Sequence, residues 1–437
     1  MPVESAVDTR LSGRLDIGAM KLVVFAHTPP PHHGQSYMVQ LLLEGMGGDL
    51  RKRRGGHGSV DFGIDCYHVN ARVSKNLEDV GGVRFNKLFL LFWHCAQAIW
   101  CRFRYGAATL YYVPAPGKKA SLYRDWLVMG LCRPFFRRVV FHWHASSLAR
   151  WLEITANGRT RGLTYRFLGQ ADLSIVLSRY NRYNAEKLWP GRIEVVANGI
   201  PDPCPEFESR VLPRREARMA ARRKILAGLP LTAREQSNAG AEPATVRVLF
   251  LAHCTREKGL FEAAQAVLMA NGRLRAEHSP LSFQLVIAGT FPSPAEKREF
   301  EAMLEAAPGA AAIQHVGFVQ GALKSQALLE ADLLCFPSHW ENQPVSVIEA
   351  LAFGLPTAIT RLPSVCEMMP PGYRGVAAVA SPEELAAALW ELVTYDQFAA
   401  LREHFLAHFA LRSFCTNLSS ALHSLEGLPQ DRRAHVS

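Results

Sequence analysis

Two carboxylates eight residues apart, Glu341 and Glu349, have the residue type and spacing that most directly suggest chemistry in this chain. The apolar run 333–336 precedes them and predicts a buried parallel strand. Pro344 fits the first position of a helix, where a missing N–H is tolerated, so Glu341 precedes the helix and Glu349 lies on it. A second strand is predicted at 357–360. The pattern therefore predicts a strand–helix–strand unit with Glu341 in the loop at the carboxyl edge of its sheet.

That edge is where open α/β sheets bind ligands, so the start of the predicted helix is a candidate anion site. Its backbone amides around 343–346 would favour a phosphate group, and the candidate binding residues there are Gln343, Pro344 and Val345. Amides for a diphosphate and carboxylates for hydroxyl groups together suit a sugar nucleotide. The alternative is that both glutamates only solvate the beginning of a helix.

The same residues carry a resemblance to a known family. Glu341-x7-Glu349, followed by EALAFGLP and a later Glu367, resembles the retaining glycosyltransferases of the GT-B fold, in the large group called family 4. The resemblance covers roughly residues 21–425 and is strongest over 246–367. It implies an α/β fold of two Rossmann-like doubly wound domains that face a cleft. It also implies a nucleotide-diphosphate sugar as donor, with no metal or other cofactor.

The resemblance implies roles for residues of the second half. Lys258, followed by Gly259, would stabilise the leaving diphosphate, which gains negative charge as the glycosidic bond breaks. Glu341 would hold the donor sugar and Glu349 the ribose hydroxyls. Main chain near Val319 would meet the base.

One position departs from the family. The arginine that should accompany Lys258 falls on His253, which weakens the expected cation clamp, and Arg256 is a nearby candidate substitute. By itself, Lys258 would be better explained as a solvated loop lysine.

Two residues of the first half complete the implied site. Gly34 follows a Pro-rich loop after the strand predicted at 21–26, and the family's glycine at this place approaches the donor diphosphate. His144 ends the strand predicted at 139–144 and would line the donor sugar. The alternative for Gly34 is a glycine that only relaxes a turn. His142 points to the same face as His144, so a pair of metal ligands is conceivable. The sequence offers no obvious third ligand, and no metal is expected.

At 437 residues the chain is long enough for two or three domains. A strand, a loop and a helix start recur near residues 21 and 246, as two similar doubly wound domains would produce. The expected division is a flexible tail (1–19), an acceptor-binding domain (20–204), a linker or insert (205–245), a nucleotide-sugar-binding domain (246–400), and a helix that crosses back with a tail (401–437).

The net charge of +10 and the pI near 9.2 predict attraction to an anionic surface. The segment 88–103 is apolar almost all round, and eight Lys or Arg residues lie from Arg102 to Arg138 against Asp125 alone. Trp and Phe interleaved with cations are typical of a protein that lies on an anionic membrane. The alternative is a buried helix beside an ordinary basic surface. Nucleic acid is not expected as a partner, because the basic segment contains no recognisable reading motif.

The nine cysteines form no C-x-x-C pair, and several lie in apolar runs, as reduced core cysteines do. The first twenty residues lack the apolar core of a signal peptide, and no apolar run reaches about 18 residues. We therefore expect a cytoplasmic protein, with peripheral binding to the inner face of the plasma membrane as a further expectation.

These features together predict a retaining glycosyltransferase that moves a sugar from a nucleotide-diphosphate sugar to a saccharide or lipid-linked acceptor. Bacterial surface polysaccharide or glycolipid assembly is the expected setting. The candidate catalytic residues are Glu341, Lys258 and His144. Two alternatives stay open. One is a non-catalytic GT-B homologue that binds a lipid or another partner, motivated by His253, and the other is a sugar-nucleotide epimerase.

Overall fold

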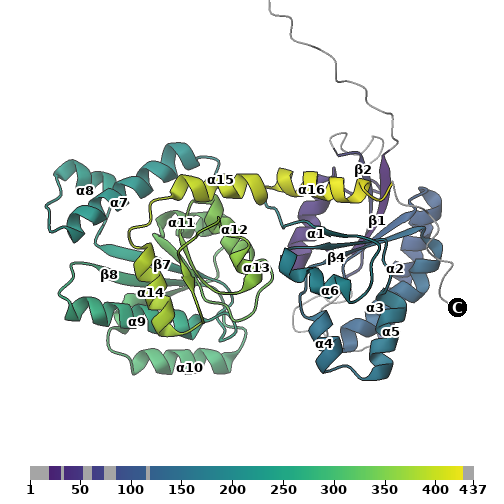
Figure 1. Ribbon diagram of the computed structural model, residues 1–437, viewed down its shortest axis with the longest axis horizontal. Coiled ribbons are helices and arrows are strands. Elements are labelled where there is room, and N and C mark those ends of the chain that lie inside the picture. The colour runs from purple at the N-terminus through teal and green to yellow at the C-terminus, as the bar shows by residue number, and fades with distance from the viewer. Residues whose placement is uncertain (1–18, 31–33, 53–61, 73–84, 115–118, 427–437) are drawn as a thin grey trace, which may run out of the picture.

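The computed structural model describes residues 19–30, 34–52, 62–72, 85–114 and 119–426. These residues form two α/β domains that lie side by side, each built around a parallel sheet (Figure 1). The expected fold class of two doubly wound α/β domains is confirmed. Residues 1–18 of the predicted tail (1–19), the loop residues 31–33 and the final residues 427–437 lie outside the described part of the chain.

The first domain contains a six-stranded sheet whose described strand pairs are all parallel. In the spatial order β2-β1-β3-β4-β5-β6, its strands are β2 (Ile64–Asn70), β1 (Met20–Ala26), β3 (Thr109–Tyr112), β4 (Arg138–Trp143), β5 (Leu173–Val176) and β6 (Ile193–Val195). The strand order reverses between β1 and β3, and folds of this kind bind ligands at the carboxyl ends of the strands beside such a point.

Helices cover both faces of this first sheet. One core cluster holds side chains from α2 (Phe85–Arg104), α3 (Lys119–Cys132), α4 (Leu148–Ile154) and α5 (Gly158–Leu168). A second cluster, on the other face, holds those of α1 (Gly34–Gly45). The remaining short elements are η2 (Arg133–Phe135), η3 (Arg179–Asn181) and α6 (Arg182–Glu186).

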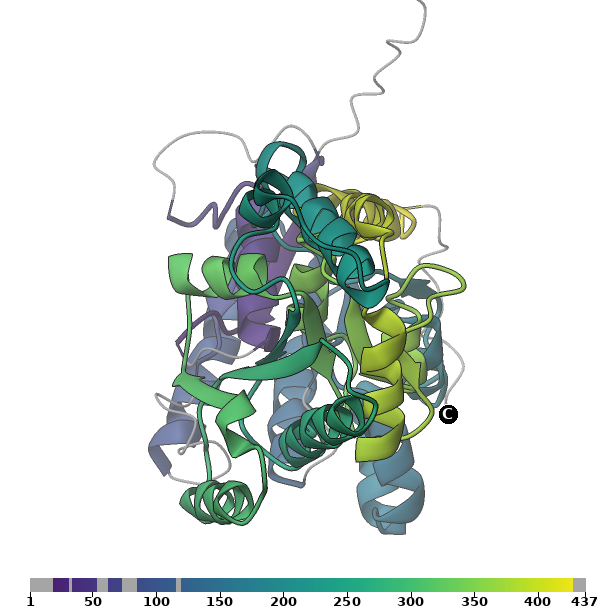
Figure 2. The same ribbon diagram turned by 90° about the vertical axis from the view of Figure 1, so that its left-hand side faces the viewer.

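The second domain repeats this plan with the spatial order β12-β11-β10-β7-β8-β9. Its strands are β12 (Val376–Ala377), β11 (Thr357–Thr360), β10 (Leu333–Phe336), β7 (Thr245–Leu251), β8 (Ser282–Ala288) and β9 (Ile313–Gly317). Both faces of the sheet are covered by helices, as Figure 2 shows from the side of this domain. Because a parallel sheet covered on both faces excludes water, all four residues of β10 are buried.

Two helix layers enclose the second sheet. On one face α9 (Leu260–Ala276) packs with α14 (Pro382–Leu392), and on the other lie α11 (Ala322–Glu330) and α12 (Val345–Ala352). The remaining elements are α10 (Pro294–Glu305), η5 (Ala310–Ala312) and α13 (Pro363–Cys366). The predicted strand–helix–strand unit is therefore β10-α12-β11, although α12 begins at Val345 and Pro344 is its N-cap rather than its first residue.

Two chain segments pass between the domains and lie together. The residues after β6 lead into the second domain, and α15 (Phe398–His408) and α16 (Leu411–His423) return along the edge of both domains, in yellow in Figure 1. The two crossings are linked where Ile200 bridges Ala410. A Cβ at Gly199 would lie 2.8 Å from the carbonyl oxygen of Ala410 and 2.4 Å from Cβ of Phe414, so this close approach requires glycine.

Residues 205–245, expected from sequence to be a linker or insert, contain folded helices that pack on the second domain. They contain η4 (Phe207–Val211), α7 (Leu212–Leu226) and α8 (Ala233–Ala239). The buried Arg215 of α7 donates hydrogen bonds to three carbonyls, those of Leu328, Ala331 and Phe353, at 2.8–3.0 Å. These carbonyls lie at the ends of α11 and α12, where a helix leaves its last acceptors unbonded.

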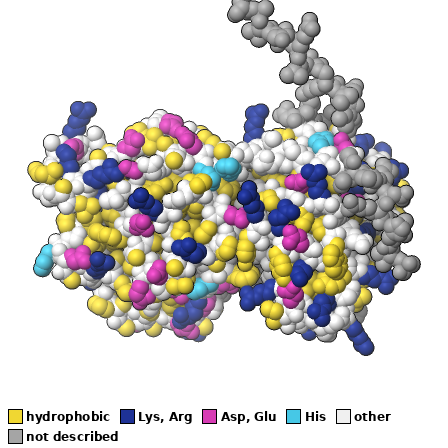
Figure 3. Space-filling view, viewed as in Figure 1, with side chains coloured by type: hydrophobic (Ala, Val, Ile, Leu, Met, Phe, Trp, Pro, Cys, Tyr) yellow, Lys and Arg dark blue, Asp and Glu magenta, His cyan; other side chains and the backbone are white. Residues whose placement is uncertain are grey.

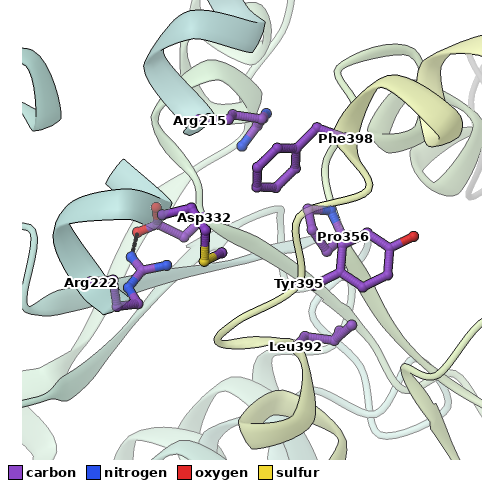
Figure 4. A pocket seen from close by; sticks show the side chains of 8 residues that line it. Arg215, Arg222, Asp332, Pro356, Leu392, Tyr395 and Phe398 are labelled. Carbon is purple, nitrogen blue, oxygen red and sulfur yellow. Dashed lines mark ion pairs between the residues drawn. The ribbon is translucent and has the colours of Figure 1, made fainter. Parts of the chain in front are cut away.

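A buried carboxylate holds the same helix to the sheet. Asp332, at the start of β10, accepts two hydrogen bonds from Arg218 at 2.8 and 3.0 Å and lies 3.1 Å from Nη2 of Arg222. Figure 4 shows the ion pair between Asp332 and Arg222 beside a cavity of about 10 Å³, large enough for one water molecule at most. Arg218 and Arg222 of α7 thus share one buried counter-charge, although a basic helix is usually a solvated one.

Two further features bear on the earlier expectations. The nine cysteines are free thiols, and eight of them are buried. None of the helices in the described ranges has the length and apolar character needed to cross a bilayer.

Candidate active site

Lys258 and Glu341 meet although 83 residues separate them in the sequence. The strands β7 and β10 are neighbours, so the loops at their carboxyl ends lie side by side. Nζ of Lys258 lies 2.5 Å from Oε1 of Glu341. The two side chains are 21% and 20% exposed, so an approaching ligand can reach both charges.

Gly259 allows these two loops to come together. Its φ of +76° is left-handed, and a Cβ there would lie 2.2 Å from the carbonyl oxygen of Pro337. Glycine is the residue that tolerates both conditions. The hydroxyl of Ser338 and the N–H of His339 donate to the carbonyl of Glu257 at 3.3 and 2.9 Å, which ties the second loop to the first beside the ion pair.

Glu349 lies on α12 and faces the first domain. It is 7% exposed, and its Oε1 accepts a short hydrogen bond from Nζ of Lys324 on α11. Burial raises the pKa of the Glu349 carboxyl above its ordinary value, although the Lys324 ammonium acts to lower it. Across the domain boundary, burial and then the charge of Glu349 raise the pKa of the Tyr37 hydroxyl on α1. A side chain of the first domain therefore lies within the field of this carboxylate.

Two side chains between Glu341 and α12 fasten the second domain to the first. Oε1 of Gln343 accepts the N–H of Asn198 at 2.5 Å, and its Nε2 donates to the carbonyl of Leu177 at 3.3 Å. Sequence reasoning placed Gln343 at the donor because of its backbone. The structure adds that its buried side chain bridges the domains.

Asn342 brings His144 to the same boundary. Nδ2 of Asn342 donates to the carbonyl of His144 at 2.8 Å, while Oδ1 accepts from Nδ2 of Asn181. The half-buried ring of His144 lies 4.3 Å from that of His142, centroid to centroid. Because Asn342 adjoins Glu341 in the chain, these contacts hold His144 close to the Lys258–Glu341 pair.

His142 supports this arrangement from inside the sheet. It is fully buried, and its Nδ1 is hydrogen bonded to the hydroxyl of Tyr111. Burial, and then the neighbouring His144, lower the pKa of His142 well below its ordinary value, so its ring is neutral at neutral pH. Within the described residues no group of three His, Cys, Asp or Glu side chains is arranged to hold a metal ion.

The other predicted residues lie along the carboxyl edges of the sheets. Gly34 opens α1, and a Cβ added there would meet no atom within 4 Å, so its backbone is accessible to a ligand. His253 is exposed just beyond β7, and Val319 is half-buried two residues beyond β9. Pro344 is the N-cap of α12 and Val345 is its first residue, and the first backbone N–H groups of a helix have no partner within the helix.

The side chain of Arg256 does not replace the arginine that the family has at the position of His253. Its guanidinium lies 2.8 Å from a carboxylate oxygen of Glu299 on α10 and 3.8 Å from the ring centroid of Phe261. The guanidinium of Arg256 therefore has an acidic partner within its own domain. His253 occupies the position of the family's arginine, and Arg256 does not take over the role of that arginine.

Several residues of the site carry no signal in the sequence. Lys324 and Tyr37 belong to ordinary helical stretches, and Ser364 donates to the carbonyl of Glu341 at 2.9 Å. Glu367, quoted only as part of the family pattern, accepts the backbone N–H groups of Arg179 and Tyr180 at 2.8 and 3.1 Å. These contacts come from distant segments, so spacing along the chain cannot reveal them.

Comparison with known families finds a similarity in the second half of the chain. Residues 233–405 match the model of the family described as glycosyl transferases group 1. The matched stretch makes up less than half of the chain. Lys258, Glu341 and Glu349 all lie inside this matched stretch, whereas Gly34 and His144 lie in the domain that precedes it. No curated protein sequence matches the chain.

Solved structures resemble the chain over nearly its whole length. HepE of Anabaena in complex with UDP and glucose is 14% identical, covers 93% of this chain and all of its own, and has a TM-score of 0.59. Sucrose-phosphate synthase of Thermosynechococcus elongatus is 16% identical, with 93% and 99% of the two chains covered and a TM-score of 0.60. The catalytic domain of starch synthase IV from Arabidopsis thaliana, bound to ADP and acarbose, is 14% identical, with 94% and 100% covered and a TM-score of 0.59. At these identities the likeness establishes the fold, which is GT-B.

Proposed function

We propose that the chain is a retaining hexosyltransferase that moves a sugar from a nucleotide-diphosphate sugar to a saccharide or lipid-linked acceptor. The observation that carries this proposal is the ion pair of Lys258 and Glu341 beside the start of α12, at the boundary with the first domain. A cation, accessible amides and carboxylates together suit a diphosphate joined to a polyhydroxyl group. The similar structures support it, since HepE is in complex with UDP and glucose and starch synthase IV is bound to ADP.

In this proposal the ion pair separates when the donor enters. The Lys258 ammonium turns to the diphosphate and offsets the charge that develops as the bond between the sugar and the phosphate oxygen breaks. Glu341 is then released to accept hydrogen bonds from hydroxyls of the donor sugar. Glu349 accepts from the ribose hydroxyls, and His144 lines the sugar from the first domain. The acceptor oxygen bonds to the sugar on the face that the diphosphate leaves, and its proton passes to a phosphate oxygen of the donor.

Further parts of the proposal follow from the family resemblance and the composition. No metal or other cofactor is required, because Lys258 and the amides of α12 supply the positive potential at the diphosphate. The setting is assembly of bacterial surface polysaccharide or glycolipid on the cytoplasmic side of the membrane. The first domain would bind the acceptor and the second the nucleotide sugar.

The test is a screen of nucleotide-diphosphate sugars, followed by a transfer assay. At least one nucleotide sugar should raise the melting temperature of the purified protein, and the same donor should be consumed when membrane extract supplies the acceptor. Stabilisation without consumption would favour the non-catalytic alternative, for which exposed His253 and the Arg256–Glu299 pair are the specific observations. Conversion of the nucleotide sugar without any acceptor would favour an epimerase.

Replacing Glu349 with alanine should raise the dissociation constant of the donor by about 10–100-fold, the effect of losing a hydrogen bond to a charged group. Donor affinity should also fall as the pH drops through the raised pKa of Glu349, because the protonated carboxyl is a poorer acceptor. Lys324→Ala removes the cation that lowers this pKa, so the loss of affinity should begin at a higher pH.

Isothermal titration calorimetry between pH 5 and 8 checks both effects. Glu305→Ala, an exposed carboxylate at the end of α10, is the matched control and should bind the donor as the parent protein does. Unchanged donor binding by the Glu349 variant would remove this residue from the site.

A further inference from the structure

The outward side of α2 is apolar along nearly its whole length. Phe89 is 75% exposed, Trp93 55%, Trp100 53% and Phe103 67%, and the neighbouring Leu88 and Phe92 are exposed as well. We call these six residues the α2 face. The opposite side of the helix is equally apolar, but it is buried against the sheet through Leu91, Cys95 and Ala98. A helix that is apolar all round and covered on one side only leaves an unpartnered surface.

The α2 face lies away from the second domain. Its helix belongs to the core on the far side of the first sheet, whereas the core shared between the two domains includes α1, α12 and α15. Figure 1 shows α2 at the end of the molecule opposite the second domain. The surface is therefore separate from the candidate active site and from the contacts between the domains.

The segment that carries this face has charges of nearly one sign. Residues 85–138 contain nine Lys or Arg residues and a single acidic residue, Asp125. Asp125 is fully buried and is already bonded to the hydroxyl of Tyr112 and to Arg124. Among the cations, Arg104, Lys119 and Arg137 are exposed. On the side of the molecule shown in Figure 3, by contrast, basic and acidic side chains are intermixed over both domains.

We propose that the α2 face docks on a lipid bilayer that contains anionic headgroups. Trp and Phe side chains partition into the boundary between headgroups and acyl chains, and each nearby Lys or Arg adds attraction to anionic lipid. The helix lies on the bilayer rather than crossing it, since none of the described helices can span one. The lipid contact stands independently of the proposed function, and only its use in presenting a lipid-linked acceptor rests on that function.

The charge and composition of the chain disfavour other occupants. A second copy docked on the same face would bring two strongly basic surfaces together, which like-charge repulsion opposes. The segments outside the described residues contain no Phe, Trp or Tyr and carry several charges, so their composition does not match an aromatic face. Anionic lipid supplies both the apolar layer and the opposite charge.

Docking through this face would place the acceptor side of the molecule near the membrane. α2 connects β2 to β3, two parallel strands, so it runs antiparallel to them and begins at the carboxyl edge of the sheet. Leu88, Phe89 and Trp93 lie in this first half of α2. The candidate residues Gly34 and His144 are at the same edge of the first sheet.

Vesicle flotation with the full chain tests the proposal. The parent protein should float with vesicles of phosphatidylcholine and phosphatidylglycerol, and much less with phosphatidylcholine alone. Phe89→Ser combined with Trp93→Ser should lower the partition coefficient at least tenfold. Ile154→Ser combined with Trp390→Ser changes two exposed apolar residues outside the α2 face and should bind as the parent does. Thermal melts of the variants, with and without a nucleotide, verify that folding and donor binding are retained.

A second measurement distinguishes insertion from simple charge attraction. Vesicles with brominated acyl chains should quench the tryptophan fluorescence of the parent protein, and Trp93→Phe with Trp100→Phe should remove most of that quenching. The proposal is overturned if the parent fails to bind anionic vesicles, or if the serine variant binds as the parent does. It is also overturned if the serine substitutions dissociate a dimer in analytical ultracentrifugation while vesicle binding is unchanged. Because these assays need no sugar donor, their failure would leave the proposed transferase activity intact.

Discussion

Replacing Lys258 with alanine is expected to lower the rate of sugar transfer by about 10²–10³-fold, the usual loss when a donor to a developing negative charge is removed. The proposed function requires a cation at the leaving diphosphate, and Lys258 is accessible and adjoins Glu341. The fold should survive, because removing one partner of a partly exposed ion pair has a small effect on stability. Steady-state kinetics with the donor found by screening, alongside a thermal melt, measures both properties.

Arg256→Ala is the matched control for this change. Arg256 lies two residues earlier in the same loop, but its guanidinium is paired with Glu299 and stacked on Phe261. Its removal should change the transfer rate by less than about threefold, within the range of a surface ion pair. A Lys258 variant that keeps more than a third of the parent activity would contradict the role given to this ammonium. An Arg256 variant as impaired as the Lys258 variant would show that the cation clamp is built differently.

Replacing Asp332 with alanine is expected to lower the free energy of unfolding of the second domain by about 3–5 kcal/mol, the effect of breaking a buried ion pair by removing one partner. Arg218 and Arg222 would stay buried without their counter-charge, since both are less than 5% exposed. Urea unfolding at pH 7 gives the change. Asp396→Ala, which removes the exposed partner of Arg223 on the same helix, should cost less than about 1 kcal/mol.

The same carboxylate predicts a dependence of stability on pH. Burial by itself would raise the pKa of Asp332, but the charges of Arg222 and Arg218 outweigh it and lower the pKa to about 2. A lowered pKa stabilises the folded state at pH values above the ordinary value of 3.8, and this stabilisation is lost as the pH falls toward 2. The parent protein should therefore lose stability between pH 4 and 2 more steeply than the Asp332→Ala variant. Equal slopes in that range would contradict the assignment.

The basic helix α7 shows where composition misleads. Pro, Arg and Ala residues over 205–245 suggest a linker, because charged side chains usually favour water. In the folded chain, Arg215 donates to the open carbonyl ends of α11 and α12, and Arg218 is paired with Asp332. The carbonyls of α11 and α12 and the carboxylate of Asp332 are about a hundred residues away in sequence. No local sequence pattern could therefore predict these contacts.

For the segment 88–103, the sequence could not predict which side of the helix is buried. Its sequence is apolar almost all round, which left a buried helix and a membrane-facing helix as equal alternatives. Hydrophobic periodicity detects a buried face by contrast with a polar one, and the few polar residues of this segment give little contrast. The packing of α2 against one side of the first sheet decides which residues are covered and which form the α2 face.

Local patterns in the sequence were sufficient for the two parallel sheets, for the unit β10-α12-β11, and for the place of Glu341 in the loop after β10. Apolar runs, the residues that start and end helices, and an anion-binding helix start each depend on a few neighbouring residues. They can therefore be recognised from the sequence alone. Only the tertiary structure decided that Lys258 meets Glu341, that Lys324 pairs with Glu349, and that Asn342 and Gln343 fasten one domain to the other. Such pairs depend on which strands become neighbours and on how the domains are placed, and these are properties of the whole folded chain.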